Sequence, residues 1–198
     1  MKRYGIFGGT FNPPHIAHLI QAECVREEMS LDKIIFIPSA NPPLKNLPDV
    51  IESEHRFNMA KLAFETDKNF EVSDIELQSP YETSYTVSTL LKLKEIYKND
   101  DVKLYLIIGM DNLIQLPQWK SPNKLFSMAE VVVINRPGYY IEDAPEQFVR
   151  SVVYVPVPSL DISSSMIRSR IKQNKSIKYL VPESVNNYIS KNKLYKNG

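Results

Sequence analysis

Cysteine is nearly absent from this sequence, and so is any excess of charge. One cysteine, Cys24, stands among 198 residues, which excludes a disulfide within the chain. Its place among apolar residues at helical spacing predicts a core residue rather than a nucleophile. The formal net charge is only +1, which excludes a chain-wide basic field for nucleic acid. Any anion must therefore be bound by a local site.

Long hydrophobic runs are also missing. No apolar stretch has the length of a signal sequence or a membrane span, so we expect a cytoplasmic protein that binds neither membrane nor nucleic acid. The length and the 43% hydrophobic content are ordinary for one globular domain. We expect a single domain over 1–198, with a C-terminal helical portion at 162–198. The sequence leaves open whether the chain forms a homo-oligomer.

What the chain does have is a regular alternation of apolar strands and amphipathic helices. The predicted strands are 4–7, 34–37, 70–75, 104–108, 131–134 and 152–155, and the predicted helices are 15–29, 54–65 (capped by Ser53), one capped by Thr86, 164–173 and 182–190. The alternation favours an α/β fold, a Rossmann-like doubly wound parallel sheet of five to six strands with helices on both faces and a small C-terminal helical part. Ligands of such sheets bind at the carboxyl ends of the strands.

A first motif follows the first predicted strand directly, Gly8-Gly9-Thr10-Phe11-Asn12-Pro13-Pro14-His15-Ile16-Ala17-His18. Its glycines leave room for a phosphate against the main chain, and its threonine offers a hydroxyl. His15 and His18 share one face of a first helical turn, where unpaired N–H groups favour an anion. The spacing is neither a dinucleotide-binding glycine pattern nor a Walker loop. Taken alone, the histidines would also fit a helix surface or, with further ligands that the sequence does not cluster, a zinc site.

A second motif lies near the C-terminus, at 161–168. Serines open a predicted helix there, and Arg168 follows Ser164 by one turn on the same face. Hydroxyls, helix N–H groups and a guanidinium would form a second grip for a polyphosphate. On its own, the segment also fits a helix cap beside a solvated arginine.

The two motifs resemble the paired signatures of the nucleotidylyltransferase superfamily. The first is similar to T/HxGH, with Ala17 in place of glycine, and the second to ISSTxxR, with Ser165 in place of threonine. Further segments in the same order resemble the nicotinate-nucleotide adenylyltransferase family, namely 38–45, 84–86, 108–111, 116–120, 135–138, 179–182 and 188–189. Leu44 and Lys120 depart from the family pattern, which usually has histidine and often tyrosine there.

The resemblance implies transfer of an adenylyl group from ATP to nicotinate mononucleotide, in NAD biosynthesis. It implies Mg²⁺ held mainly by the ATP phosphates and water, with no protein ligands. The catalytic residues would be His18, His15 and Arg168. The other ATP-binding residues would be Gly8, Gly9, Thr10, Phe11, Arg136, Ile162, Ser163 and Ser164. The pyridine nucleotide would contact Lys45, Ser84, Tyr85, Thr86, Gly109, Asp111, Trp119 and Lys120.

The residues proposed for the acceptor suit a pyridine ring. Trp119, the only tryptophan, offers a flat surface to an electron-poor ring, although a lone tryptophan also serves as a core residue. The Thr86 N–H would receive a carboxylate at a helix start, and Asp111 would accept from ribose hydroxyls or cap a helix. Two alternatives stay open. One is a related transferase whose acceptor is nicotinamide mononucleotide or pantetheine phosphate, and the other is a nucleotide sensor without turnover. Whether loop 40–51 closes over substrate also stays open.

Overall fold

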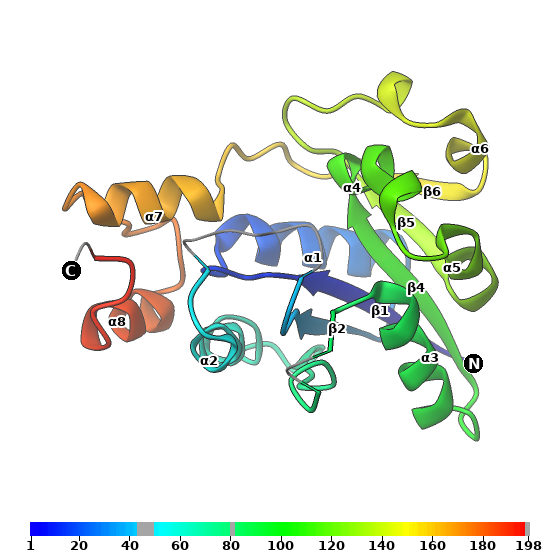
Figure 1. Ribbon diagram of the computed structural model, residues 1–198, viewed down its shortest axis with the longest axis horizontal. Coiled ribbons are helices and arrows are strands. Elements are labelled where there is room, and N and C mark those ends of the chain that lie inside the picture. Colours follow the sequence, from blue (N-terminus) through cyan, green and yellow to red (C-terminus); the bar gives the residue numbers. More distant parts are fainter. Residues whose placement is uncertain (43–49, 80–81, 197–198) are drawn as a thin grey trace.

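Six parallel strands form one sheet at the centre of the molecule (Figure 1). The computed structural model describes residues 1–42, 50–79 and 82–196. The strands are β1 (Lys2–Gly9), β2 (Lys33–Pro38), β3 (Phe70–Val72), β4 (Val102–Gly109), β5 (Glu130–Ile134) and β6 (Val152–Val155), in the order β3-β2-β1-β4-β5-β6. The strand order reverses between β1 and β4, which is where open α/β sheets bind ligands. The expected Rossmann-like class is confirmed, with six strands.

Helices cover both faces of the sheet (Figure 1). One face carries α1 (Ile16–Glu28), α2 (Ser53–Phe64), α7 (Ser164–Lys172) and α8 (Glu183–Lys191), and the other carries α3 (Thr86–Ile96), α4 (Met110–Gln115), α5 (Pro122–Met128) and α6 (Glu146–Val149). Two short 3-10 helices, η1 (Leu116–Gln118) and η2 (Ile141–Asp143), complete the chain as described. Phe7 belongs to the first core cluster and its neighbour Ile6 to the second, because successive strand residues point to opposite faces.

Three local predictions differ from the structure. Ser53 and Thr86 are the first helical residues rather than the caps, which are Glu52 and Tyr85. Hydrogen bonds between Ser84 and Asn41 hold the chain just before α3, so this helix begins directly after Tyr85. The third strand ends at Val72 rather than at residue 75, because it is an edge strand that pairs with three residues of β2 only. Cys24 is half-buried and packs against the core of the α1 face.

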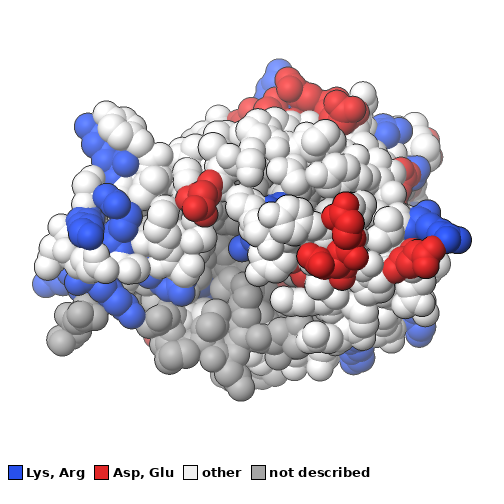
Figure 2. Space-filling view, turned by 90° about the horizontal axis from the view of Figure 1, so that it is seen from above, with Lys and Arg blue, Asp and Glu red and all other residues white. Residues whose placement is uncertain are grey.

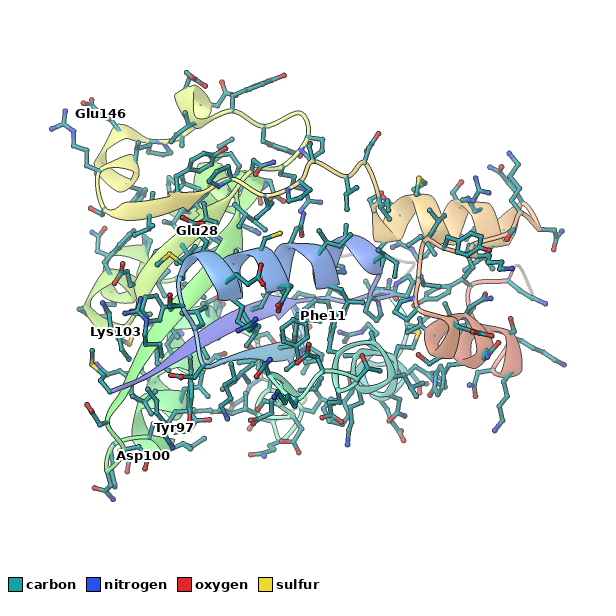
Figure 3. All side chains as sticks on the ribbon, turned by 180° about the vertical axis from the view of Figure 1, so that it is seen from behind. Phe11, Glu28, Tyr97, Asp100, Lys103 and Glu146 are labelled. Atoms are coloured by element: carbon teal, nitrogen blue, oxygen red, sulfur yellow. The ribbon has the colours of Figure 1, made fainter. Side chains whose placement is uncertain are left out.

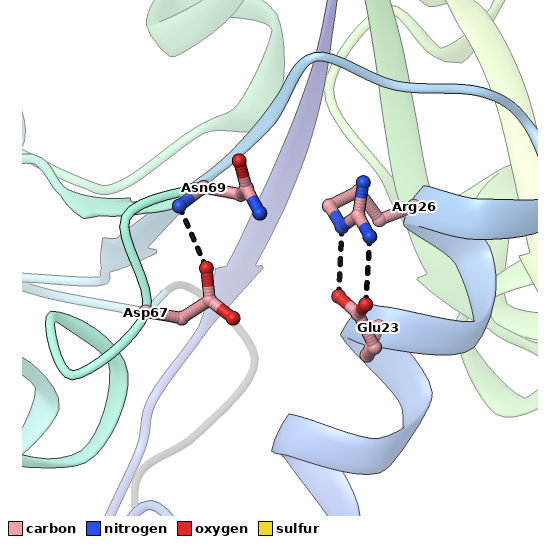
Figure 4. A network of polar contacts seen from close by, with 4 residues as sticks. All are labelled: Glu23, Arg26, Asp67 and Asn69. Carbon is pink, nitrogen blue, oxygen red and sulfur yellow. Dashed lines mark hydrogen bonds and ion pairs between the residues drawn. The ribbon is translucent and has the colours of Figure 1, made fainter.

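Two polar contacts lie near the amino ends of the strands, far from the two predicted phosphate motifs. Arg26 makes a two-pronged ion pair with Glu23 at 2.7 Å, and Asp67 accepts the Asn69 N–H at 2.7 Å in the turn before β3 (Figure 4). Both contacts are local, one within α1 and one within a turn, and both lie away from the carboxyl ends of the strands. Within the residues that the structure describes, no helix combines the length and the apolar character needed to cross a membrane.

Candidate functional site

The two predicted phosphate motifs lie against each other, although 151 residues separate the partners of one of their contacts. The Ser164 hydroxyl donates to the Pro13 carbonyl at 2.8 Å, and Arg168 Nη1 donates to the Asn12 carbonyl at 3.0 Å. The Tyr195 hydroxyl donates to the Asn12 side-chain oxygen at 2.9 Å. The C-terminal helices therefore dock on the loop after β1 through hydrogen bonds to that loop.

His15 and His18 stack on each other at the start of α1, with ring centroids 3.6 Å apart. His15 is the N-cap and is only 6% exposed. Burial lowers the pKa of His15 to about 3, with nearby Arg136 as a second cause, so this side chain is neutral at pH 7. His18 Nδ1 accepts the His15 backbone N–H at 3.1 Å, which leaves the proton of a neutral His18 ring on Nε2. His18 therefore presents Nε2 as a donor.

The two glycines of the first motif have different structural roles. A Cβ on Gly8 would meet no atom within 4 Å, so this residue leaves open space for a ligand. A Cβ on Gly9 would come within 2.9 Å of the Phe11 ring, so Gly9 makes room for a protein side chain instead.

Phe11, predicted among the ATP-binding residues, has its side chain in the core rather than in the cavity. Its ring is 3% exposed and meets His18 and Phe64 edge-on, at centroid distances of 5.1 and 5.3 Å. It lies beneath α1, among the side chains of the core (Figure 3). The backbone of Phe11 has φ 46°, a left-handed turn that lets the apolar ring reach the core while the loop stays at the surface of the site. Only the main chain of Phe11 can then contact a phosphate.

A cavity of about 240 Å³ joins the first motif to the predicted acceptor residues. Gly8, Gly9 and Thr10 form part of its wall. The rest includes six of the eight residues predicted to contact the pyridine nucleotide, Ser84, Tyr85, Thr86, Gly109, Trp119 and Lys120. Lys45 and most of the 40–51 loop lie outside the described residues. The structure thus brings residues from four separate segments to one hollow at the carboxyl ends of β1 and β4.

The acceptor side of this cavity has two features that attract an anion. Helix α3 begins without a capping side chain within the described part of the chain. Its first N–H groups, from Thr86 onward, therefore lie uncapped at the positive end of the helix dipole, which favours an anion. Lys120 Nζ lies 4.4 Å from the centre of the Tyr85 ring, next to that helix start. A carboxylate would find both a helix N-terminus and an ammonium group there.

Asp111 and Arg136, predicted for different substrates, form an ion pair with Oδ2 and Nη1 2.9 Å apart. Asp111 is in the first turn of α4, whose cap is Gly109, so the helix-cap alternative is wrong. Asp111 Oδ1 is buried and has no hydrogen-bond partner in the part of the chain that is described. A Cβ on Gly109 would lie 2.5 Å from that oxygen, which explains the glycine.

Sequence reasoning missed several polar residues of the site. Glu76 and Thr89 line the cavity, and the Thr89 hydroxyl donates to Glu76 Oε1 at 2.6 Å. Arg56 is 1% exposed beneath the first motif. It shares the buried stripe of α2 with Met59, Ala60 and Ala63, and a charged residue at that spacing was a usable sign. Tyr195 had no comparable sign in the sequence.

Basic side chains gather over the end of the molecule that carries α7 (Figure 2). The stretch 164–196 holds one acidic residue, Glu183, and eight basic ones, Arg168, Arg170, Lys172, Lys175, Lys178, Lys191, Lys193 and Lys196. The phosphate motifs therefore lie in a locally positive field despite the small net charge. Within residues 1–42, 50–79 and 82–196, no three His, Cys, Asp or Glu side chains group as metal ligands would.

Comparison with known proteins gives the same picture. The cytidylyltransferase-like family matches residues 6–170. A Thermoanaerobacter sp. protein named "Probable nicotinate-nucleotide adenylyltransferase" is 44% identical over 98% of this chain and 94% of its own length. The nicotinate-nucleotide adenylyltransferase of Bacillus subtilis is 38% identical over 99% and 100%. The structure of Plasmodium falciparum nicotinic acid mononucleotide adenylyltransferase complexed with NaAD shares the fold, with a TM-score of 0.79, 22% identity and 98% of both chains covered.

Proposed function

The chain belongs to the cytidylyltransferase-like family and, within it, to the nicotinate-nucleotide adenylyltransferases of NAD biosynthesis, and from this premise we propose how its site joins ATP to nicotinate mononucleotide. The observation that carries the proposal is the single cavity whose wall runs from Gly8–Thr10 to Thr86 and Trp119. This supports the proposal because the loop that would bind phosphates and the side chain that would stack on the pyridine ring line the same cavity.

ATP would bind with its triphosphate between the first motif and the start of α7. The main chain of Gly8 to Phe11 and the hydroxyls of Thr10, Ser163 and Ser164 would surround the phosphates, with Ile162 packed behind them. Arg168 Nε is buried and has no partner among the described residues, so it can donate to a phosphate oxygen while Nη1 holds Asn12. His15 would hold a phosphate nearby, and Arg136 would border the adenine.

The pyridine ring would lie in the cavity against Trp119, with Tyr85, Ser84 and Gly109 as neighbours. Its carboxylate would accept from the Thr86 N–H and pair with Lys120. Asp111 would accept from ribose hydroxyls, and Lys45 would contact the mononucleotide phosphate.

The reaction would be an in-line displacement at the α-phosphorus of ATP. An oxygen of the mononucleotide phosphate forms the new bond to that phosphorus, and the bond from phosphorus to the β-phosphate oxygen breaks, so that deamido-NAD forms and pyrophosphate leaves. The attacking oxygen is already ionised at pH 7, so no general base is needed. His18 Nε2–H would donate to an α-phosphate oxygen as charge builds there, and Arg168 would stabilise the leaving pyrophosphate.

Mg²⁺ would be held mainly by phosphate oxygens and water, and when bound it would neutralise phosphate charge. The groups proposed around the triphosphate are hydroxyls, backbone amides and cations, which would bind phosphate oxygens rather than Mg²⁺ itself. We also propose a cytoplasmic location, where ATP and the mononucleotide are available.

Pyrophosphate release tests this function. The purified protein is given Mg-ATP with nicotinate mononucleotide, nicotinamide mononucleotide or 4′-phosphopantetheine in parallel. We expect the highest kcat/KM with nicotinate mononucleotide. A preference for either other acceptor would contradict the proposed substrate, and ATP binding without pyrophosphate from any acceptor would identify a sensor instead.

A further inference from the structure

Arg56 is a buried cation with an unusual set of partners. It is 1% exposed, and within the described residues no carboxylate lies at ion-pair distance from it. Among the described residues, every acceptor of its guanidinium is a main-chain carbonyl. Nε donates to Ile51 at 3.1 Å, Nη1 donates to Thr10 at 2.9 Å and Ser39 at 2.6 Å, and Nη2 donates to Ala40 at 3.2 Å. Burying a charge is unfavourable unless such bonds compensate, so the arrangement needs an explanation beyond packing.

The carbonyls that Arg56 binds come from two loops of the site. Thr10 is in the loop after β1, whereas Ser39 and Ala40 follow β2, the neighbouring strand. The two loops are also joined by the Ser39 N–H, which donates to the Gly9 carbonyl at 2.9 Å. One side chain therefore fixes the backbone of both loops at the carboxyl edge of the sheet.

Peptide geometry determines what this does on the other side of each loop. A trans peptide unit is planar, and its C=O and N–H point in opposite directions. The Ala40 carbonyl points to Arg56, and the N–H of the same unit, from Asn41, donates to Ser84 Oγ at 3.0 Å. The Asn41 carbonyl in turn accepts the Ser84 N–H at 2.9 Å. Arg56 thus holds, through one peptide unit, the segment that leads to Thr86.

The same geometry applies to the phosphate loop. The Thr10 carbonyl points to Arg56, so the N–H of Phe11 in that peptide unit is turned away from Arg56. Because the Phe11 ring is locked in the core, this peptide has little freedom to rotate. The N–H is therefore kept on the side of the loop opposite Arg56.

We infer that Arg56 is a positioning residue that sets two parts of the site relative to each other, through the Thr10–Phe11 and Ala40–Asn41 peptide units. The phosphate half is the loop after β1, and the acceptor half is the part of the cavity formed by residues 84–86 and Trp119. Arg56 touches neither substrate. The inference rests on the proposed function, because it assigns phosphates to the first loop and the pyridine carboxylate to Thr86.

Replacement by lysine tests the inference. Arg56→Lys keeps the charge but offers one nitrogen, which cannot bind four carbonyls on two loops. We expect kcat/KM to fall about tenfold or more, because a small misplacement of reacting groups is costly in rate. We also expect KM to rise for both ATP and the mononucleotide, because both loops lose their fixed positions. Arg26→Lys is the matched control, since Arg26 pairs with Glu23 at the opposite edge of the sheet, and it should leave both KM values unchanged (Figure 4).

A double-mutant cycle with Ser84 separates positioning from a general loss of stability. Ser84→Ala removes the acceptor of the Asn41 N–H, and we expect it to raise KM for the mononucleotide severalfold while KM for ATP stays the same. Combined with Arg56→Lys, its effect on that KM should be less than additive, because both variants release the same peptide unit. Thermal unfolding is recorded for every variant.

The outcomes are distinguishable. An inactive wild type would contradict the proposed function rather than the role of Arg56. A folded Arg56→Lys variant with wild-type KM values, or additive effects of Arg56→Lys and Ser84→Ala, would overturn the inference. Should Arg56→Lys fail to fold, Ser84→Ala still decides, because an unchanged KM for the mononucleotide contradicts the link through Asn41.

Discussion

The two halves of the site are built in different ways. In the phosphate half, side chains from distant segments donate to main-chain carbonyls of one loop, Arg56 to Thr10, Arg168 to Asn12 and Ser164 to Pro13. The acceptor half is a cavity whose wall includes Trp119 and Thr86. The first half is one loop that receives hydrogen bonds from three distant side chains, whereas the second is a hollow that also contains a polarised helix start.

The difference between the two halves matches their proposed roles in the reaction. Charge moves at the α-phosphorus, and groups that stabilise such a change must be fixed before it occurs. The pyridine ring is far from the reacting bonds and keeps its charge, so contacts with it bind substrate and transition state alike. Substitution of a residue that contacts the reacting phosphates should therefore change kcat, and substitution of a residue that contacts the pyridine ring should change the KM of the mononucleotide.

The strongest test of this division is His18→Ala. Removal of one transition-state donor should lower kcat by about a hundredfold or more, with a smaller change in either KM. Steady-state pyrophosphate release measures it. His55→Ala is the control, because His55 bonds to Tyr188 between α2 and α8 and should leave kcat within about twofold. Near-normal turnover of the His18 variant would end the proposed role of that residue.

Arg168→Met should have the next largest effect. It removes the donor to the Asn12 carbonyl and the buried Nε, so we expect kcat/KM for ATP to fall by roughly ten- to a hundredfold. Arg170→Met, on the same helix, is the control, because its Nε bonds to the Ser176 carbonyl on the outer side. Equal losses in the two variants would mean that the helix contributes only its general charge.

Trp119→Ala should act on binding alone. Loss of a stacking surface costs about 1–3 kcal/mol per ring, so the KM for nicotinate mononucleotide should rise about tenfold while kcat and the KM for ATP change little. Trp119→Phe should keep most of the affinity. Trp119 is the only tryptophan, so quenching of its fluorescence by the mononucleotide reports the contact directly. A rise in the KM for ATP instead would contradict the division between the two halves.

The sequence was sufficient to predict those parts of the site that are formed by short contiguous segments. The motif after β1 and the motif that opens α7 are each contiguous, and the topology of a parallel sheet places the ends of its strands at one edge. The acceptor residues were likewise found as short segments next to strand or helix ends. Six of those segment residues meet in one cavity, which the resemblance to a family had suggested without geometry.

What the sequence could not provide depends on contacts between distant backbones. The carbonyls held by Arg56 belong to residues 10, 39, 40 and 51, and no pattern in the chain links them. The Tyr195 bond to Asn12 joins residues 183 apart. Phe11 stands in a surface motif, and only the left-handed turn at that residue explains why its ring is in the core. These features follow from tertiary structure rather than from composition or spacing.

The smallest expected effect concerns His15 and the stability of the phosphate half. Burial holds the pKa of His15 at about 3 in the folded chain, below its ordinary value of 6.5. As pH falls below that ordinary value, the unfolded chain binds a proton that the folded chain does not, so stability is full above pH 6.5 and decreases toward pH 3. From pH 6.5 to 5.5, this contribution to the free energy of unfolding should fall by about 1 kcal/mol. Urea unfolding of the wild type and of His15→Gln at both pH values measures it, and the variant should lose less stability. Identical losses would show that His15 titrates alike in the folded and unfolded chain, and a neutral, buried His15 would then no longer describe the phosphate half.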